Sequence, residues 1–183
     1  MQKKRILALF LAAVSCLSLA VSASAASTTT RKATDFKDYD RTAWYAEAVS
    51  AAVDNGLLYG KSSSIIDPNG AMTRAEMAAI INRSFGCYAK ADISKYKDVS
   101  KDKWYFEDVA MAVQMGTYNG RSNTAMAPDA PITRQEALTV VARALELDYD
   151  SYSKTDLSAF SDRSEISNWA MPYVRAMVGA DYI

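Results

Sequence analysis

Residues 72–76 read Met-Thr-Arg-Ala-Glu, and residues 132–136 read Ile-Thr-Arg-Gln-Glu, sixty positions later. In each segment a threonine stands three residues before a glutamate, which is the spacing of a helix capping box. In that box the threonine hydroxyl accepts from the glutamate N–H, and the carboxylate accepts from the threonine N–H. Apolar side chains then follow at helical intervals. The two segments therefore predict the starts of two equivalent helices.

The offset of sixty residues extends far beyond these two segments. Residues 36–85 align with residues 96–145 without a gap, and 16 of the 50 positions are identical. The shared positions include a Trp-Tyr pair, two glycines, a proline and an arginine near the end of the second helix. A third, partial copy begins at residues 160–162 (Phe-Ser-Asp), contains Trp169 and reaches Ile183. The sequence is therefore an array of repeats.

Each repeat is predicted to hold two helices joined by an irregular loop. The first helix is expected to begin near the tryptophan, with an N-cap two residues earlier, at Thr42, Asp102 and Ser167. Gly56 and Gly116 are expected to end it in a left-handed conformation. A helix pair of this size cannot bury its own apolar stripe. We therefore predict an all-α fold of tandem helix–loop–helix repeats, each of about 60 residues, packed as one composite domain.

The first 25 residues predict a secretory signal peptide. Lys3, Lys4 and Arg5 precede an apolar run, and residues 23–25 (Ala-Ser-Ala) suit signal peptidase. The alternatives are a membrane anchor and a lipoprotein processed at Cys16. The remaining boundaries are a flexible lead-in at 26–35, repeats at 36–90 and 91–150, and a partial third repeat at 151–183.

Composition excludes several function classes. The 21 basic and 21 acidic residues give no net charge, and no basic stripe of the kind that binds nucleic acid is present. The absence of histidine excludes Ser-His-Asp and Cys-His catalysis and imidazole zinc sites. One aspartate recurs in each repeat, at Asp38, Asp98 and Asp162, and turn capping explains these residues better than calcium binding does. We expect no metal, no cofactor, no nucleic-acid partner and, after signal cleavage, no membrane partner.

The repeated residues resemble the S-layer homology domain family. The resemblance rests on Phe36-Lys-Asp38, Trp44, residues 56–60 (Gly-Leu-Leu-Tyr-Gly), Pro68 and residues 72–76, with their partners sixty positions later. It implies three copies about a pseudo-threefold axis, in a secreted protein at the cell wall. It also implies non-covalent anchoring through secondary cell-wall polysaccharide, often pyruvylated, with the arginine of Thr-Arg-x-Glu in the binding groove.

Carried over, that arginine is Arg74 in the first repeat and Arg134 in the second. Capping explains the threonine and the glutamate, but a cation in the first helical turn faces the positive end of the helix dipole. An anionic ligand would explain it, and a salt bridge to the neighbouring repeat is the alternative. Replacing both arginines is then expected to leave folding almost intact. The predicted ligand-binding residues share a place at or near this helix start: Arg74, Arg134, Thr73, Thr133, Glu76, Glu136, Lys61 and Arg121. For Lys61 and Arg121 a solvated loop charge is the competing account.

Three questions stay open at the level of sequence. Trp44, Trp104 and Trp169 can stack on sugars, although a core or inter-repeat contact is the preferred interpretation. A self-associating structural layer protein is the alternative function, and a glycoside hydrolase fragment is a weaker one. The third repeat lacks a Thr-Arg-x-Glu before Ile183. Three explanations are open: the chain is a fragment of a longer protein, which is the preferred one, another chain completes that repeat, or the three-copy form is degenerate here.

Overall fold

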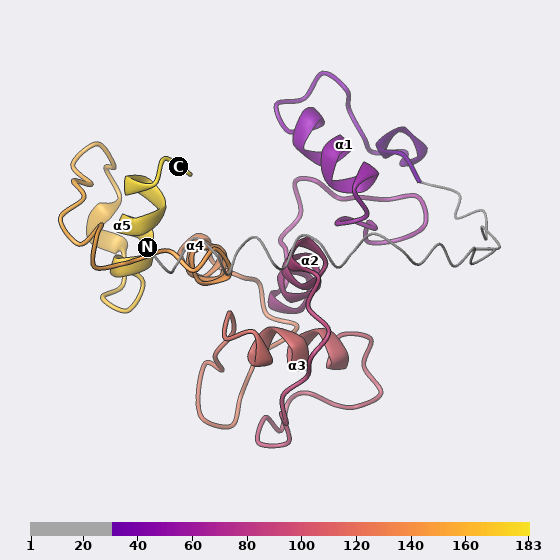
Figure 1. Ribbon diagram of the computed structural model, residues 1–183. Helices are drawn as coiled ribbons and strands as arrows, with labels where there is room; N and C mark the ends of the chain where they lie inside the picture. The colour runs from indigo at the N-terminus through magenta and orange to yellow at the C-terminus, as the bar shows by residue number, and fades with distance from the viewer. Residues whose placement is uncertain (1–30) are drawn as a thin grey trace, which may run out of the picture. The chain divides into compact units, whose positions relative to one another are not determined.

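The computed structural model describes residues 31–183, and Figure 1 shows its course. The predicted signal peptide, with Cys16, lies outside the described residues. The described part of the chain contains five α-helices and no strand, apart from one isolated bridge between Thr73 and Pro131. Within residues 31–183 no helix is long and apolar enough to cross a membrane. The prediction of an all-α fold is confirmed.

The helices follow the repeat. The first repeat holds α1 (Ala46–Asp54) and α2 (Arg74–Phe85), and the second holds α3 (Phe106–Gln114) and α4 (Arg134–Ala144). The third holds α5 (Met171–Gly179), and two short 3-10 helices are η1 (Ala33–Asp35) and η2 (Arg163–Glu165). Of the predicted lead-in at 26–35, residues 31–35 lie within the described part of the chain, and there η1 buries Ala33 against Phe36 and Val53.

The second helix of one repeat packs on the first helix of the next. Helix α2 contacts α3, and α4 contacts α5, as the neighbouring labels in Figure 1 indicate. The main apolar core joins α2, α3 and α4 through buried residues such as Ile81, Val109 and Val140. This arrangement covers the apolar stripe of α2 with side chains from another repeat. This packing agrees with the prediction that a single helix pair is too small to bury its own apolar stripe.

Both predicted capping boxes are present. The Thr73 hydroxyl accepts from Glu76 N at 3.2 Å, and Thr73 N donates to Glu76 Oε2 at 2.8 Å. Thr133 and Glu136 repeat this geometry at the start of α4. At α2 the next amides, Arg74 N and Ala75 N, donate to the carbonyls of Ala130 and Pro128 in the second repeat. The start of α2 is therefore satisfied partly by its own box and partly by the neighbouring repeat.

The first helices begin differently from the prediction. Their N-caps are Tyr45, Tyr105 and Ala170, and none of these makes a side-chain capping bond. The expected caps at Thr42, Asp102 and Ser167 were wrong, because a hydrogen-bonded turn precedes each helix. In the first repeat Ala46 N donates to Ala43 O at 3.0 Å, which already satisfies an amide that a cap would serve.

Aspartates and glycines hold the loops that follow α1 and α3. Asp38 accepts from the amides of Ile66 and Asp67, and Asp98 accepts from the equivalent amides sixty residues later. Gly56 and Gly116 end their helices with φ of +68° and +77°, as predicted. In the third repeat Asp181 takes that position with φ of +58°. The same backbone path is thus retained without the glycine.

Candidate functional site

Two open grooves lie at equivalent places in the first and second repeats. The first groove, of about 460 Å³, is formed by the loop after α1, by α2 and by Trp104 of the next repeat. The second groove, of about 560 Å³, is formed by the loop after α3, by α4 and by Trp169 of the third repeat. Eight lining positions correspond at the offset of sixty residues: 58, 59, 60, 61, 76, 79, 80 and 83 with 118, 119, 120, 121, 136, 139, 140 and 143.

An ion pair between a loop cation and the capping glutamate lines each groove. Lys61 Nζ lies 2.6 Å from both carboxylate oxygens of Glu76. In the second groove Arg121 lies 3.2 Å from Glu136 Oε1 through Nε and 3.1 Å from Oε2 through Nη2. Lys61 and Arg121 are therefore paired loop cations, and each lines the groove of its own repeat.

Burial and hydrogen bonding act in opposite directions on the pKa of each capping glutamate. Burial raises the pKa of Glu76, but the Lys61 ammonium and the Thr73 amide outweigh burial and hold it below its ordinary value. Burial likewise raises the pKa of Glu136, but the Thr133 amide, Arg121 and Arg74 together outweigh burial and hold it below its ordinary value. Both carboxylates are therefore charged at neutral pH.

Arg74 is buried between the first and second repeats. Only 5% of the residue is exposed. Its Nη1 donates to Glu136 at 3.0 Å, its Nε to Met126 O at 3.0 Å and its Nη2 to Asn119 O at 3.1 Å. The guanidinium also lies over the Tyr118 ring, whose hydroxyl donates to Arg74 O. The salt bridge to the neighbouring repeat, the alternative account of this arginine, is present, and the expectation that its removal leaves folding intact does not fit this burial.

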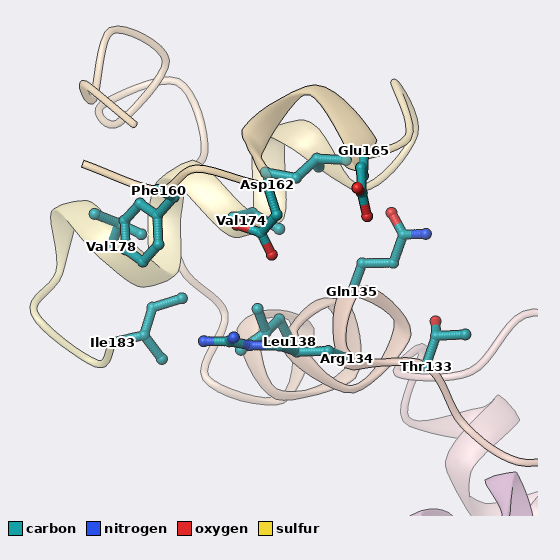
Figure 2. A pocket seen from close by; sticks show the side chains of 11 residues that line it. Thr133, Arg134, Gln135, Leu138, Phe160, Asp162, Glu165, Val174, Val178 and Ile183 are labelled. Carbon is teal, nitrogen blue, oxygen red and sulfur yellow. The ribbon is translucent and has the colours of Figure 1, made fainter. Parts of the chain in front are cut away.

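Arg134, at the equivalent position of α4, is exposed. It lines a smaller pocket of about 210 Å³, the Arg134 pocket, with apolar side chains of the third repeat (Figure 2). Asp162 and Glu165 also line that pocket. Gln135 connects α4 to the third repeat, because its Oε1 accepts from Ser167 N at 2.9 Å. Among the predicted residues, Thr133 lines this pocket, whereas Thr73 lines neither groove.

The tryptophans are not core residues. Trp44 is 92% exposed, Trp104 60% and Trp169 51%, so of the preferred interpretation, a core or inter-repeat contact, the core part was wrong. Trp104 and Trp169 instead border a groove of the preceding repeat, whereas Trp44 borders neither groove. Each indole contacts the following tyrosine edge to face in the first two repeats. Their helical spacing suggested a buried face, but the turn before each helix points them outward.

Sequence reasoning missed Arg83 and Arg143, which line the two grooves. Arg83 Nη1 donates to Leu57 O at 3.0 Å, and its guanidinium stacks over the Tyr59 ring. Arg143 donates to Thr117 O and to the Tyr173 hydroxyl. Their recurrence at the offset of sixty residues was the available signal. Their proximity to the loop cations emerges only when the loop folds back on the helix.

The chain is an all-α tandem repeat, and each complete copy has an open groove at the equivalent place. This arrangement is typical of a binding module built from repeats. Residues 35–78 and 95–138 each match the family model of the S-layer homology domain, and through these segments the chain belongs to that family. Domains of this family are binding and anchoring modules, not catalytic ones, and they bind cell-wall polymers. The family and its surface-layer members indicate a secreted protein located at the cell surface, in the cell wall.

Three relatives illustrate the range of proteins that carry similar segments. The chain is 34% identical over 147 residues to the Surface-layer 125 kDa protein of Lysinibacillus sphaericus, covering 80% of this chain and 12% of that one. It is 27% identical over 177 residues to an endoglucanase of Bacillus sp. (strain KSM-635), covering 95% and 19%. It is 23% identical over 143 residues to the S-layer protein sap of Bacillus anthracis, covering 78% and 17%. The chain therefore spans less than a fifth of each of these relatives.

Proposed function

We propose that this chain anchors a secreted protein non-covalently by binding secondary cell-wall polysaccharide in its two grooves. The observation that carries the proposal is the repetition of one lining: an exposed tryptophan, a paired loop cation and an arginine. Sugar rings present apolar C–H faces and polar edges. An indole offers apolar contact to the ring face, and charged side chains offer hydrogen bonds to hydroxyl and carboxylate groups.

The open shape and the position of the grooves suit a long polymer better than a small substrate. The grooves are open, and each lies between two repeats, so an extended chain can occupy them without being enclosed. Two equivalent sites on one module also raise avidity, since the second contact becomes intramolecular once the first has formed. Pyruvylation of the polysaccharide belongs to this proposal, because a ketal-linked carboxylate would pair with the arginines.

Hydrolysis of the polysaccharide is disfavoured by the chemistry of the carboxylates. A glycosidase needs a carboxylic acid whose pKa is raised so that it holds a proton near neutral pH. Glu76 and Glu136 have lowered pKa values, and each accepts from a cation and a backbone amide. We therefore propose that the chain is not an enzyme.

The proposal is tested by co-sedimentation of the purified chain with isolated cell walls. Trp104→Ala combined with Trp169→Ala is expected to abolish sedimentation with walls. Trp44→Ala is the matched control, because Trp44 is the most exposed tryptophan and lines neither groove. Walls stripped of polysaccharide should not retain the unmodified chain. Retention of the double variant on intact walls, or binding to stripped walls, would contradict the proposal.

Sedimentation velocity of the same samples separates anchoring from the alternative of a self-associating layer protein. An anchoring module is expected to sediment as one species at the concentrations that give full wall binding. Concentration-dependent assembly that persists in the wall-binding-deficient double variant would favour the structural alternative.

A further inference from the structure

Three Asn-Gly steps occur in the sequence, and they begin at Asn55, Asn69 and Asn119. In such a step the backbone nitrogen of the glycine can attack the side-chain carbonyl carbon of the asparagine, because no Cβ atom on the second residue hinders its approach. Asparagine is one of the thermolabile residues of proteins. The reactivity of each step in a folded chain depends on how freely the asparagine side chain and the glycine amide can meet.

Asn55 and Asn119 are held by side-chain hydrogen bonds. Asn55 caps the end of α1, where its Nδ2 donates to Ala51 O at 2.8 Å. The Asn119 amide, in the orientation that satisfies both of its ends, donates to Tyr118 O at 3.2 Å and accepts from Arg143 Nη1 at 3.3 Å. Both side chains must give up these bonds before the glycine nitrogen can attack them.

Asn69 lies in an exposed turn and is held less firmly. Within the described residues its side-chain amide has no hydrogen-bond partner, and Gly70 is exposed beside it. The turn is closed by Gly70 N, which donates to Asp67 O at 3.1 Å. The glycine amide donates a hydrogen bond at all three Asn-Gly steps, so the freedom of the asparagine side chain distinguishes them. The attack at Asn69 requires only that one turn at the surface opens.

The first loop itself requires the glycine that makes this step reactive. The Asp67 carboxylate occupies the place that a Cβ atom of residue 70 would take. The second repeat has Ala127 and Ala130 at these two places, so its loop does not need a glycine there. The residue before Ala130 is Asp129, which has no side-chain amide to lose. The reactive step is therefore confined to the loop of the first repeat.

We propose that Asn69 is a site of spontaneous deamidation in the folded protein, and that the fold protects Asn55 and Asn119. Hydroxide takes the proton of the Gly70 amide, and the nitrogen forms a bond to Asn69 Cγ. The Cγ–Nδ2 bond breaks, and ammonia leaves with a proton from water, so that a succinimide ring remains. A water molecule opens this ring at Cγ to give aspartate, or at the backbone carbonyl carbon to give isoaspartate. The net reaction consumes water, transfers the proton of the new carboxyl group to the released ammonia and involves no oxidation.

Both products alter the border of the first groove. They place a new carboxylate between Pro68 and Gly70, which line that groove. Isoaspartate also adds a carbon atom to the main chain, so the hydrogen bond from Gly70 N to Asp67 O loses its geometry. A further consequence rests on the proposed function: wall binding through the first groove declines as the chain ages, whereas the second groove keeps its loop.

Peptide mapping by mass spectrometry compares the three steps in one sample of the folded chain kept in mildly alkaline buffer. Deamidation at Asn69 is expected to be faster than at Asn55 or Asn119 by about tenfold, roughly the factor by which one hydrogen bond changes a rate. In urea, which removes the fold, the three rates should become similar. Equal rates in the folded chain, a faster reaction at Asn55 or Asn119, or a preference for Asn69 that persists unchanged in urea would overturn the inference.

Two variants test the chemistry of the step. Asp67→Ala combined with Gly70→Ala gives the first loop the alanines of the second, and the new Cβ atom hinders the attack. This variant is expected to deamidate at Asn69 more slowly by about tenfold. Asn69→Gln, which disfavours ring closure by lengthening the side chain, should remove most of the ammonia that the folded chain releases. Undiminished deamidation at Asn69 in the first variant, or undiminished ammonia release by the second, would contradict the proposed reaction.

Co-sedimentation with cell walls tests the consequence for binding separately. The unmodified chain is expected to be retained less after ageing than before, whereas Asn69→Gln should be retained equally at both times. Equal retention of the fresh and the aged unmodified chain would show that the modified loop does not affect the groove. If the fresh unmodified chain fails to bind walls, the proposed function is wrong, and the three deamidation rates still decide the modification site.

Discussion

At the scale of single residues, one motif places two identical arginines in opposite environments. Arg74 is enclosed by the second repeat and makes three hydrogen bonds to groups 45 to 62 residues away. Arg134 stands at the same helical position and is exposed. Position in a motif therefore fixes the local backbone, whereas the neighbouring repeat decides whether the side chain is structural. The assignment of Arg134 to ligand binding stays a prediction.

The two arginines should differ sharply in their contribution to stability. Arg74→Ala is expected to lower the free energy of unfolding by about 2–4 kcal/mol, because it leaves buried carbonyls and part of the Glu136 charge unpaired. Arg134→Ala should change it by less than ~0.5 kcal/mol, as is usual for an exposed side chain. Urea unfolding followed by tryptophan fluorescence measures both values. Equal effects would show that the buried contacts of Arg74 contribute nothing specific.

Glu136 predicts a particular dependence of stability on pH. Its pKa in the folded protein lies below the ordinary value of 4.5. The unfolded chain therefore takes up this proton more readily, so the carboxylate stabilises the fold fully above about pH 4.5. That contribution is lost as the pH falls through the lower, folded-state pKa. Glu136→Gln should be less stable than the unmodified chain at pH 7, and the two should converge in acid. Parallel unfolding curves from pH 7 to pH 3 would contradict this account.

At the scale of elements, the capping boxes and the loop glycines were predictable because their chemistry is local. A threonine and a glutamate three residues apart need only their own backbone to form a box. The first-helix caps and the tryptophan environments were not predictable in the same way. They depend on turns before each helix and on a groove wall supplied by another repeat. The partners of Arg74 were inaccessible for the same reason, because the loop that receives its side chain belongs to the next copy.

The capping boxes should contribute independently of the grooves. Thr133→Ala is expected to lower the free energy of unfolding by ~1 kcal/mol, because Glu136 N loses its acceptor at the start of α4. Thr133→Ser keeps the hydroxyl and should restore most of that loss. Thermal unfolding of the two variants gives the comparison. An alanine variant as stable as the unmodified chain would mean that water replaces the cap without cost.

The loop of the second groove requires glycine at position 120 for reasons of space. A Cβ atom there would lie 2.5 Å from Ser122 O and 2.7 Å from Ala125 O, and both of these are backbone atoms. Gly120→Ala is therefore expected to lower the free energy of unfolding by about 1–3 kcal/mol. Gly86→Ala is the comparison, because its Cβ would meet open space and only its φ of +63° is unfavourable. That change should cost about 1 kcal/mol. A smaller loss for Gly120→Ala than for Gly86→Ala would show that the loop can open.

At the scale of the whole molecule, export precedes any contact with the wall. The predicted signal peptide implies a mature chain that begins at Ala26. Cells producing the protein are expected to release this form from their walls when treated with denaturant, because the binding proposed for the grooves is non-covalent. N-terminal sequencing of the extracted protein checks the processing site. A lipid-modified Cys16 at the N-terminus would establish the lipoprotein route instead.

The distribution of core contacts predicts that stability is uneven along the chain. Helices α2, α3 and α4 share the main core, whereas the only described element that α1 contacts substantially is η1. Val109 and Ala112 on α3 are fully buried, while the equivalent Val49 and Ala52 on α1 are half-buried.

Regions with few buried contacts open locally at a lower free energy than the rest of the fold. Amide hydrogens of α1 should therefore exchange faster than those of α3, although the two helices have equal length and equivalent places in their repeats. Hydrogen exchange followed by mass spectrometry compares the two helices within one sample. Equal protection of the two helices would show that α1 is stabilised by contacts other than those with η1. Slower exchange confined to α1 after addition of cell walls would show that a wall component binds over this helix.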